Sequence, residues 1–372
     1  MRAFISFLFV IVLSAVGQGQ VATTPTSSPT PSVPAAQAAA KAPSALPDLP
    51  KDAGEIFAAA APFYDFGSVV LKPWHMKVSY QLFDDKGESA SQGSYEYWWA
   101  SPETYRSTWL RPGVEHTDWH VNGERFESES GEPLNFFERK LQSDLLSPMP
   151  KPADLDPEKV RFQREEENFS GVKLPCVMVI RKMPLGHGIQ VVPMGMFPTY
   201  CFTPEHPILR SYFAYGGTSV IYNKIARLQG MLLPREVTIF AGKRRLLHAS
   251  VDTVDGISAS ALELKPRDGL VPTRDVSVGI ASGVAVGFLQ KRVQPVYPQD
   301  AKDARIQGKV VLEATIGTDG RVHELNVLEG PSPSLIASAM VSVSQWEYRP
   351  YLLNGVPVEV HTTVNVIYSL GN

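Results

Sequence analysis

The chain has 372 residues, of which 44% are hydrophobic, a size and composition that predict two or three folded domains and exclude a mainly disordered chain. Lys and Arg together number 35 and Asp and Glu 38, so the formal net charge is −3. A dedicated nucleic-acid-binding protein normally carries a strong basic excess, so we predict no nucleic-acid partner. The two cysteines are too few for a disulfide scaffold or a thiolate zinc site.

The N-terminus is predicted to be a targeting segment. Arg2 precedes an apolar run from Phe4 to Val16 that ends in small residues, which is the pattern of a secretory signal peptide over residues 1–17. A short retained membrane anchor is the alternative, although ~14 helical residues span only about 21 Å of a ~30 Å hydrocarbon core. In either case we expect the protein to be exported to the periplasm, free or tethered to the inner membrane.

Residues 18–52 are rich in proline and alanine and are predicted to form a linker. The stretch from Val21 to Pro50 holds seven prolines and no glycine or aromatic residue. Proline favours an extended chain of ~3.1 Å per residue, so this stretch could reach up to about 90 Å. It is either a leader without a role or a spacer that holds folded domains away from a membrane.

Residues 53–265 are predicted to form a β-rich domain. Met76–Leu82 alternates apolar and polar residues with the period of two that is typical of a half-buried strand. Turn residues follow at Asp84–Gly87, and Gly93–Trp99 is predicted to be the returning strand of a hairpin. One short helix is predicted from the helical spacing of four apolar residues, Leu134, Phe137, Leu141 and Leu145.

Further strands of this block are predicted by their β-branched and aromatic content. They are expected at Tyr105–Leu110, Trp119–Val121, Lys159–Gln163, Leu174–Arg181, Ser211–Tyr215, Ser219–Ile225, Arg235–Phe240 and Arg245–Val251. Gly230–Pro234 is expected to be a loop between two of them. Together these elements predict a curved antiparallel sheet, or half-barrel, with a helix across its open face.

Five of the six tryptophans lie in the first third of this block: Trp74, Trp98, Trp99, Trp109 and Trp119. Large aromatic residues favour sheets, so we expect these side chains in the core and on the sheet faces. The alternative is that they line an apolar cavity between the sheet and the helix.

The order of motifs in this block resembles the LolA-like lipoprotein-carrier superfamily. The points of resemblance are a lysine-containing amphipathic first strand at Lys77–Leu82, a Gly93–Tyr97 strand before Pro102–Arg106, and a strand entry at Leu233–Val237. In that superfamily the concave face holds acyl chains or other hydrophobic ligands. The resemblance therefore implies a periplasmic carrier of a lipid or another hydrophobic ligand as one reading of this block.

The two cysteines, Cys176 and Cys201, both lie in strand-like sequence. Export to an oxidising compartment favours a structural disulfide between them, and closing a loop of this size would stabilise the fold by ~3 kcal/mol. Two separate buried thiols are the alternative. Neither cysteine has a histidine beside it in sequence, so we do not expect a catalytic thiol.

Residues 290–372 are predicted to form a second, α+β domain after an interdomain linker at 266–289 that is marked by glycines. The expected elements are a helical turn at Gln299–Ala304, strands at Lys309–Ile316 and Val322–Leu328 joined by the Thr318–Gly320 turn, a helix opened by Pro331–Pro333, and a final strand at Val358–Leu370. Their order is β-β-α-β.

This string closely resembles the C-terminal domain of TonB-family energy transducers. The matching elements, in order, are Gln294-Pro295-x-Tyr297-Pro298, Ala304-Arg305-Ile306-x-Gly308-x-Val310, Asp319-Gly320-Arg321-Val322, Trp346-x-Tyr348-x-Pro350 and Gly355-x-Pro357-Val358. Members of this family are non-enzymatic and bind a short extended segment, the TonB box, of an outer-membrane transporter. The resemblance thus implies transmembrane transport, with such a transporter or another envelope protein as the partner.

The final strand is expected to lie at or near a sheet edge, where free main-chain groups can pair with an extended peptide. The candidate partner-binding residues are Gln294, Val360, His361, Thr362, Thr363, Val364, Asn365 and Val366. Trp346 and Tyr348 are expected to pack in the core. The alternative for the final strand is that it is capped within the chain or used in a homodimer.

The chain departs from a standard transducer in its organisation. A standard member has a retained N-terminal anchor that couples to a proton-driven motor, and its Pro-rich spacer runs directly into the C-terminal domain. Here the β-rich block of residues 53–265 lies between spacer and C-terminal domain. Energised transport and capture of a partner without a motor are therefore both open.

Enzyme motifs fail on inspection. His323-Glu324 begins a metalloprotease-like string, but Val327 stands where the second histidine would be. His116 and His120 are four residues apart, but in strand-like sequence, where helical pairing does not apply. The chain has no Gly-x-Ser-x-Gly elbow and no P-loop. We therefore predict no enzyme, no metal ligand and no cofactor.

Overall fold

A computed structural model describes residues 45–66, 71–151, 154–169, 171–182, 192–214, 217–258, 264–273 and 278–370. The predicted signal peptide or anchor, residues 1–17, and most of the predicted linker 18–52 lie outside the described residues. No helix within the described ranges is long and apolar enough to cross a membrane.

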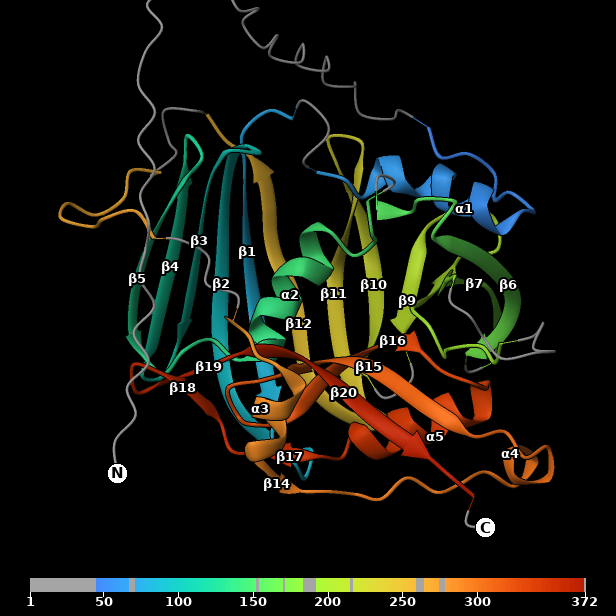
Figure 1. The fold of residues 1–372 in the computed structure, drawn as a ribbon. Helices are drawn as coiled ribbons and strands as arrows, with labels where there is room; N and C mark the ends of the chain where they lie inside the picture. The colour runs from blue at the N-terminus through green and yellow to red at the C-terminus, as the bar shows by residue number, and fades with distance from the viewer. Residues whose placement is uncertain are drawn as a thin grey trace, which may run out of the picture. The chain divides into compact units, whose positions relative to one another are not determined.

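A large curved antiparallel sheet of twelve strands dominates the first block (Figure 1). The strands are β1 (Trp74–Phe83), β2 (Ser89–Ser101), β3 (Thr104–Arg111), β4 (Val114–Val121), β5 (Glu124–Gly131), β6 (Val160–Phe169), β7 (Val172–Arg181), β8 (Thr199–Phe202), β9 (Leu209–Phe213), β10 (Ser219–Leu228), β11 (Met231–Ala241) and β12 (Arg244–Gly256). Their order in the sheet is β5-β4-β3-β2-β1-β12-β11-β10-β9-β8-β7-β6. The first strand therefore pairs with the last one, while all other neighbours are consecutive in sequence.

The predicted helix is α2 (Phe136–Leu146), which lies across one face of this sheet over β11 and β12 (Figure 1). It begins with a capping box in which the Asn135 side chain accepts from the Glu138 backbone N–H and Glu138 accepts from the Asn135 N–H. Leu141 and Leu145 are buried in the core beneath it. The mainly β fold, with its curved sheet and crossing helix, is as predicted.

An N-terminal helix and short turn were missed: α1 (Ala53–Ala60), followed by a 3-10 turn at Ala61–Phe63. Asp52 caps α1 by accepting a hydrogen bond from the Glu55 N–H. The Phe57 ring packs on Tyr200 with a centroid distance of 5.1 Å. This helix is short and rich in alanine, so its burial against distant strands, and not a local apolar period, positions it.

The loop expected at Gly230–Pro234 is wrong. Gln229 and Gly230 both have positive φ and form the whole turn, so that Leu228 pairs directly with Met231. Pro234 then lies within β11, opposite Ile225. The apolar residues after the turn are buried strand residues, because a two-residue turn of this kind continues the pairing on both sides without a longer loop.

The tryptophans are mainly core residues, as expected. Trp74, Trp99, Trp109 and Trp119 are buried, and only Trp98 is half-buried. Trp74 and Trp99 also line a cavity on the α2 side of the sheet, so the two readings of these residues are compatible.

The second block contains a four-stranded sheet in the order β13-β20-β15-β16. Its elements, with the short pieces around them, are β13 (Val278–Gly279), α3 (Ser282–Gly287), β14 (Leu289–Lys291), α4 (Gln299–Asp303), β15 (Gly308–Ile316), β16 (Val322–Glu329), α5 (Pro333–Val343), β17 (Glu347–Tyr348), β18 (Tyr351–Leu353), β19 (Val356–Val358) and β20 (Val360–Tyr368). The predicted β-β-α-β order is therefore present as β15, β16, α5 and β20.

One face of this sheet packs on α5. Alternate residues of β15 and β20, such as Leu312 and Val364, are buried in one apolar cluster with Ile336 of α5. Trp346 and Tyr348 belong to the same cluster, and the Trp346 indole N–H donates to the Val293 carbonyl at 2.9 Å. The core role predicted for these two residues is confirmed.

The segment expected as a glycine-containing linker carries structure of its own. It contributes β13 to the edge of the C-terminal sheet and forms α3. The apolar cluster of the second block also takes in five residues of the first block, Met178, Ile180, Val192, Met196 and Phe197. The boundaries at 265 and 290 stay a prediction, since the two blocks share buried contacts.

Candidate functional site

The candidate partner-binding strand β20 lies between β15 and β13. On one side it pairs antiparallel with β15 along its whole length, from Gly308 opposite Tyr368 to Ile316 opposite Val360. On the other side only its first residues are paired, in parallel, with the two residues of β13. The Ile280 N–H donates to the His361 carbonyl at 3.0 Å, which continues this short pairing.

The rest of β20 has no strand partner on this side, although the short helix α3 packs against β20. In a strand, the N–H and C=O of one residue point to the same side, and successive residues alternate. The His361 carbonyl faces β13, so the main-chain groups of Thr363, Asn365 and Ile367 face that side as well. Within the part of the chain that the structure describes, no strand pairs with them. We call residues 363–368 the open edge.

The side chains of β20 alternate between core and surface. Val360, Thr362, Val364 and Val366 are buried, whereas His361 and Asn365 are exposed and Thr363 is half-buried. The four buried residues, although predicted as partner contacts, turn their side chains to the core and their main-chain groups to β15, so they offer a partner no free hydrogen-bonding group. The exposed side chains could select the register of a pairing strand.

Gln294 stands on a segment that runs along α5. Its side chain is exposed, and the neighbouring carbonyls of Val293 and Val296 accept hydrogen bonds from Ser342 and Ser338 of α5. No described contact joins the Gln294 side chain to β20. The segment reaches the strand three residues later, where the Tyr297 ring packs edge-on against Tyr368 at 5.4 Å.

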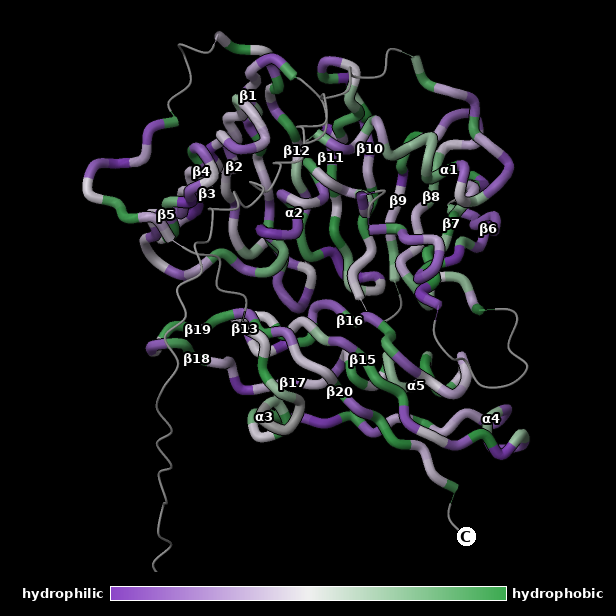
Figure 2. The backbone as a smooth tube through the Cα atoms, turned by 45° about the horizontal axis from the view of Figure 1, so that its top comes forward, coloured by the Kyte–Doolittle hydropathy of each residue, from purple (hydrophilic) through white to green (hydrophobic). Residues whose placement is uncertain are grey.

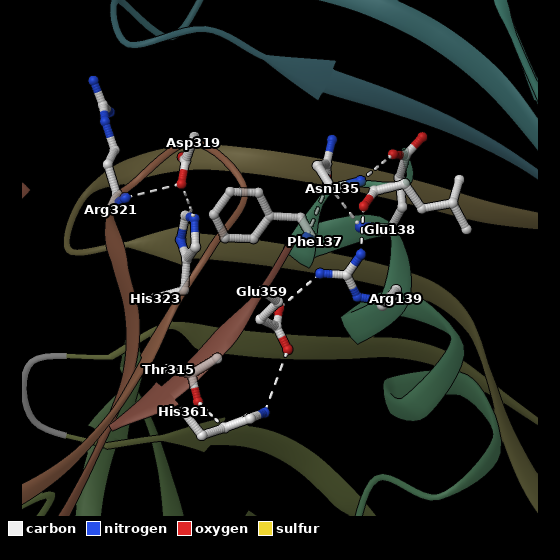
Figure 3. A network of polar contacts seen from close by, with 11 residues as sticks. Asn135, Phe137, Glu138, Arg139, Thr315, Asp319, Arg321, His323, Glu359 and His361 are labelled. Atoms are coloured by element: carbon white, nitrogen blue, oxygen red, sulfur yellow. Dashed lines mark hydrogen bonds and ion pairs between the residues drawn. The ribbon is translucent and has the colours of Figure 1, made fainter. Parts of the chain in front are cut away.

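The start of β20 belongs to a polar network with α2 (Figure 3). Arg139 of α2 forms an ion pair with Glu359 at 2.6 Å. The same carboxylate lies 3.8 Å from the His361 imidazole, which also bonds the Thr315 hydroxyl at 3.2 Å. His361 is thus engaged within the chain, which leaves Asn365 and Ile367 as the exposed side chains of the open edge.

A second part of this network surrounds His323 of β16. Its ring stacks on Phe136 with a centroid distance of 4.8 Å. Its Nε2 lies 2.9 Å from Asp319 (Figure 3). Burial alone would raise the pKa of Asp319, but the hydrogen bond from His323 and the charge of Arg321 hold this pKa below its ordinary value. His323, which the sequence placed in the His323-Glu324 string, is thus part of a packing contact between β16 and α2.

Two further carboxylates near the C-terminal sheet, those of Glu324 and Asp85, have shifted pKa values. Burial raises the pKa of Glu324, with Asp144 adding to the rise and Lys140 opposing it. Asp85, in the turn after β1, accepts two hydrogen bonds of 2.6 Å from Arg321, and chiefly these lower its pKa to about 2.

A cavity of about 970 Å³ lies on the α2 side of the large sheet. Its wall combines aromatic residues of β1 to β3, among them Trp74, Tyr97 and Tyr105, with polar residues of β4 and β5, and residues of the second block such as Val358 and Glu359 also line it. Figure 2 shows how hydrophilic residues gather on β4 and β5. The cavity is therefore apolar on one side and charged on the other.

Cys176 and Cys201 form a disulfide in the structure. They face each other on the neighbouring strands β7 and β8 and are fully buried. The bridge ties a segment of 24 intervening residues, part of which lies outside the described ranges, to the end of the large sheet.

The polar wall of the cavity was missed by the sequence reasoning. His116 and His120 were set aside because a four-residue spacing matters on a helix. On a strand, a spacing of two is the relevant signal, and it places His116, Asp118 and His120 on one face of β4. That signal was present in the sequence.

The C-terminal block is similar in sequence to known proteins. The model of the family described as Gram-negative bacterial TonB protein C-terminal matches residues 293–370. Protein TonB of Vibrio cholerae serotype O1 is 30% identical over 84 residues, which are 22% of this chain and 34% of that protein. The chain thus spans about a third of the length of this curated relative.

Solved structures resemble each block separately. The solution NMR structure of the Pseudomonas aeruginosa TonB CTD is 27% identical and covers 23% of this chain and 86% of its own, with a TM-score of 0.21. The crystal structure of a LolA superfamily protein from Nitrosomonas europaea is 8% identical and covers 55% and 94%, with a TM-score of 0.34. The match of residues 293–370 to the TonB C-terminal family confirms the resemblance predicted from the motifs between Gln294 and Val358.

Proposed function

We propose that this protein is a non-enzymatic envelope protein that captures an extended segment of a partner on the open edge of β20 and so supports transport across the envelope. The observation that carries the proposal is the unpaired main-chain side of Thr363, Asn365 and Ile367, within a segment similar to TonB C-terminal domains. Each main-chain hydrogen bond gained contributes about 0.5–1.5 kcal/mol, so a few of them suffice for reversible capture.

The partner we propose is an outer-membrane TonB-dependent transporter that offers a short extended segment to the periplasm. This choice rests on the similarity of residues 293–370 to Protein TonB. It requires export of the chain, and it holds whether the N-terminal segment 1–17 is cleaved or tethers the protein to the inner membrane. If segment 1–17 tethers the protein to the inner membrane, a motor there would also exert force on the captured partner.

The linker strand β13 limits where the partner can bind. It already occupies the main-chain side of His361, and Thr362 reinforces this contact by donating from Oγ1 to the Ile280 carbonyl at 2.9 Å. A partner strand can therefore pair with the open edge without displacing β13, but it reaches the main-chain groups of His361 only by displacing β13. We therefore expect the number of partner residues that pair with β20 to depend on how readily β13 is displaced.

Site-specific photo-crosslinking in intact cells tests the proposal. A benzoylphenylalanine at Ile367, which is 75% exposed on the open edge, is compared with one at Leu352, 53% exposed on β18. We expect position 367, and not 352, to crosslink to an outer-membrane protein, and the crosslinked peptide to come from its periplasmic segment.

Two variants of Asn365 separate main-chain from side-chain recognition. The Asn365 N–H faces the open side, so Asn365→Pro removes a donor for the partner while leaving the pairing with β15 intact. Asn365→Ala keeps the N–H and is the matched control. Loss of the crosslink in the proline variant alone supports strand addition. Equal crosslinking in both variants excludes it.

The cavity favours a second candidate function, in which the first block carries a lipid or another hydrophobic ligand. Its aromatic wall and volume of about 970 Å³ are of the size that small apolar ligands occupy. Native mass spectrometry of the chain purified from envelope extracts tests this. A lipid recovered with the protein supports the carrier role, and a protein without lipid that also fails to take up an apolar dye contradicts it.

A further inference from the structure

The charged wall of the cavity is built by the pairing of β4 with β5. His116 and Asp118 are two residues apart on β4, so their side chains lie on the same face. The antiparallel register places Glu129 opposite His116 and Glu127 opposite Asp118. All four side chains line the cavity. We call them the His116 cluster.

The donor atoms of this cluster converge. His116 Nε2 lies 2.7 Å from Asp118 Oδ2 and 3.5 Å from Glu127 Oε1. One ligand atom from each of these three residues lies within 4.8 Å of the other two. Ligand atoms bound at ~2 Å to one tetrahedral ion are about 3.3 Å apart, so the two separations from His116 Nε2 need to change by less than about 1 Å.

The histidine is buried and only partly satisfied. His116 is 5% exposed, and its Nδ1 has no hydrogen-bond partner. The nearest acidic oxygen to Nδ1 is Glu129 Oε1 at 3.7 Å. A neutral imidazole that bound an ion through Nε2 would carry its proton on Nδ1, where Glu129 can accept it, as the outer partners of metal-bound histidines commonly do.

The charges of the cluster leave room for a cation. Arg125 pairs with Asp118 Oδ1 at 2.6 Å and approaches Glu127 at 3.3 Å. Its single positive charge offsets only one of the three carboxylates. Because Arg125 holds Oδ1 of Asp118, it also fixes this carboxylate with Oδ2 toward the histidine.

We propose that His116, Asp118 and Glu127 bind a divalent transition-metal ion, with Zn²⁺ as the representative. One imidazole nitrogen and two carboxylate oxygens suit such an ion better than Ca²⁺, which takes six to eight oxygen ligands. Three protein ligands leave a coordination position open, and the cavity lies on that side. None of the three ligands belongs to the open edge of β20, although the cavity that they line also borders Glu359 and His361 at the start of that strand.

Zinc titration of the purified full-length chain tests the site. After treatment with a chelator, isothermal titration with ZnCl₂ is expected to give one strong site per chain, and Co²⁺ to give the visible absorption of a low-coordinate site. Asp118→Asn and Glu127→Gln keep the side-chain shape and are each expected to weaken Zn²⁺ binding by ~10–100-fold or more. Glu129→Gln, which removes the outer partner, is expected to weaken it by about 10-fold.

His120→Gln is the matched control, because His120 lies on the same face of β4, stacked on Tyr105 and outside the group of three ligands. It should bind Zn²⁺ like the parent chain. Circular dichroism melting of each variant establishes that it is folded. No strong Zn²⁺ site in the parent chain, or equal losses in His120→Gln and Asp118→Asn, would overturn the assignment.

Discussion

The open edge of β20 and the His116 cluster are both candidate binding regions, but they offer different chemistry. The open edge presents main-chain groups with which no described strand pairs. The His116 cluster presents side chains that are held close together by the register of β4 and β5. Main-chain recognition tolerates many side-chain changes, whereas an ion site depends on the identity of each ligand.

Because the two regions bind through different chemistry, we expect each of them to lose its binding without affecting the other. A substitution that disrupts the packing of the C-terminal sheet should leave Zn²⁺ binding intact. A substitution of a ligand in the His116 cluster should leave partner capture intact.

Trp346→Ala should have the largest effect. Trp346 is 4% exposed in the core under the C-terminal sheet, so truncation should cost about 3–5 kcal/mol of unfolding free energy and abolish capture at residue 367. Denaturant unfolding followed by circular dichroism measures the loss. Trp98→Ala, a truncation of a half-buried tryptophan on β2, is the control and should cost less. A Zn²⁺ affinity that falls with capture in Trp346→Ala would contradict the separation.

Ile280→Pro should strengthen capture. The substitution removes the N–H that binds the His361 carbonyl, so β13 competes less for β20. One main-chain hydrogen bond corresponds to roughly a 2- to 10-fold gain in affinity for a synthetic peptide of the crosslinked segment. Fluorescence anisotropy measures it, with Ile280→Ala as the control that keeps the N–H. An unchanged affinity in the proline variant would show that β13 does not compete.

Glu324→Gln should stabilise the protein at neutral pH. Burial raises the pKa of Glu324 above its ordinary 4.5, so the folded state binds its proton more tightly than the unfolded state does. Stability from this group is therefore present below pH 4.5 and is lost as pH rises through the folded pKa. The variant does not titrate, so its advantage should appear at pH 7, at about 1 kcal/mol, and vanish below pH 4.

Melting temperatures between pH 3 and 8 measure this effect. Glu329→Gln, on the same strand but 53% exposed in its side chain, is the control and should show little change. A Glu324→Gln variant that is less stable than the parent at pH 7 would contradict the role of burial. Zn²⁺ binding at pH 7 should be the same in both variants.

Asp85→Asn should have the smallest effect. Arg321 lowers the pKa of Asp85 to about 2, so the carboxylate contributes stability above pH 3.8 that is lost as pH falls toward 2. Its side chain is 60% exposed, so the contribution is only about 0.2–1 kcal/mol and shrinks with added salt. Melting curves at low and high salt measure it. Altered capture or Zn²⁺ binding would mean that this ion pair couples the two regions.

Local features were predictable because neighbouring residues decide them. The turn at Thr318–Gly320 follows from a glycine with positive φ, and the Ser332 side chain caps α5 at the Leu335 N–H. The alternation along β20 separates core from surface residues, but the prediction named all of Val360 to Val366 as partner contacts without using it. The resemblance of this block to TonB C-terminal domains could be read from the same local motifs.

Contacts between distant segments could not be predicted. The pairing of β1 with β12 joins residues such as Val78 and Val251, and Arg139 meets Glu359 across 220 positions. Nor did the glycines of the linker indicate that Gly279 would pair with His361. Many strands of similar pattern compete for each partner, and only the packing of the whole sheet selects among them.

The same distinction between local features and long-range contacts applies to the two candidate binding regions. The alternation of buried and exposed residues along β20 and the shared face of His116 and Asp118 can be read from the sequence, because the side-chain period of a strand is local. The tertiary structure decided that β13 covers only the start of β20 and that Glu127 stands opposite Asp118. Strand neighbours and register depend on burial across the whole sheet, which no short segment specifies alone.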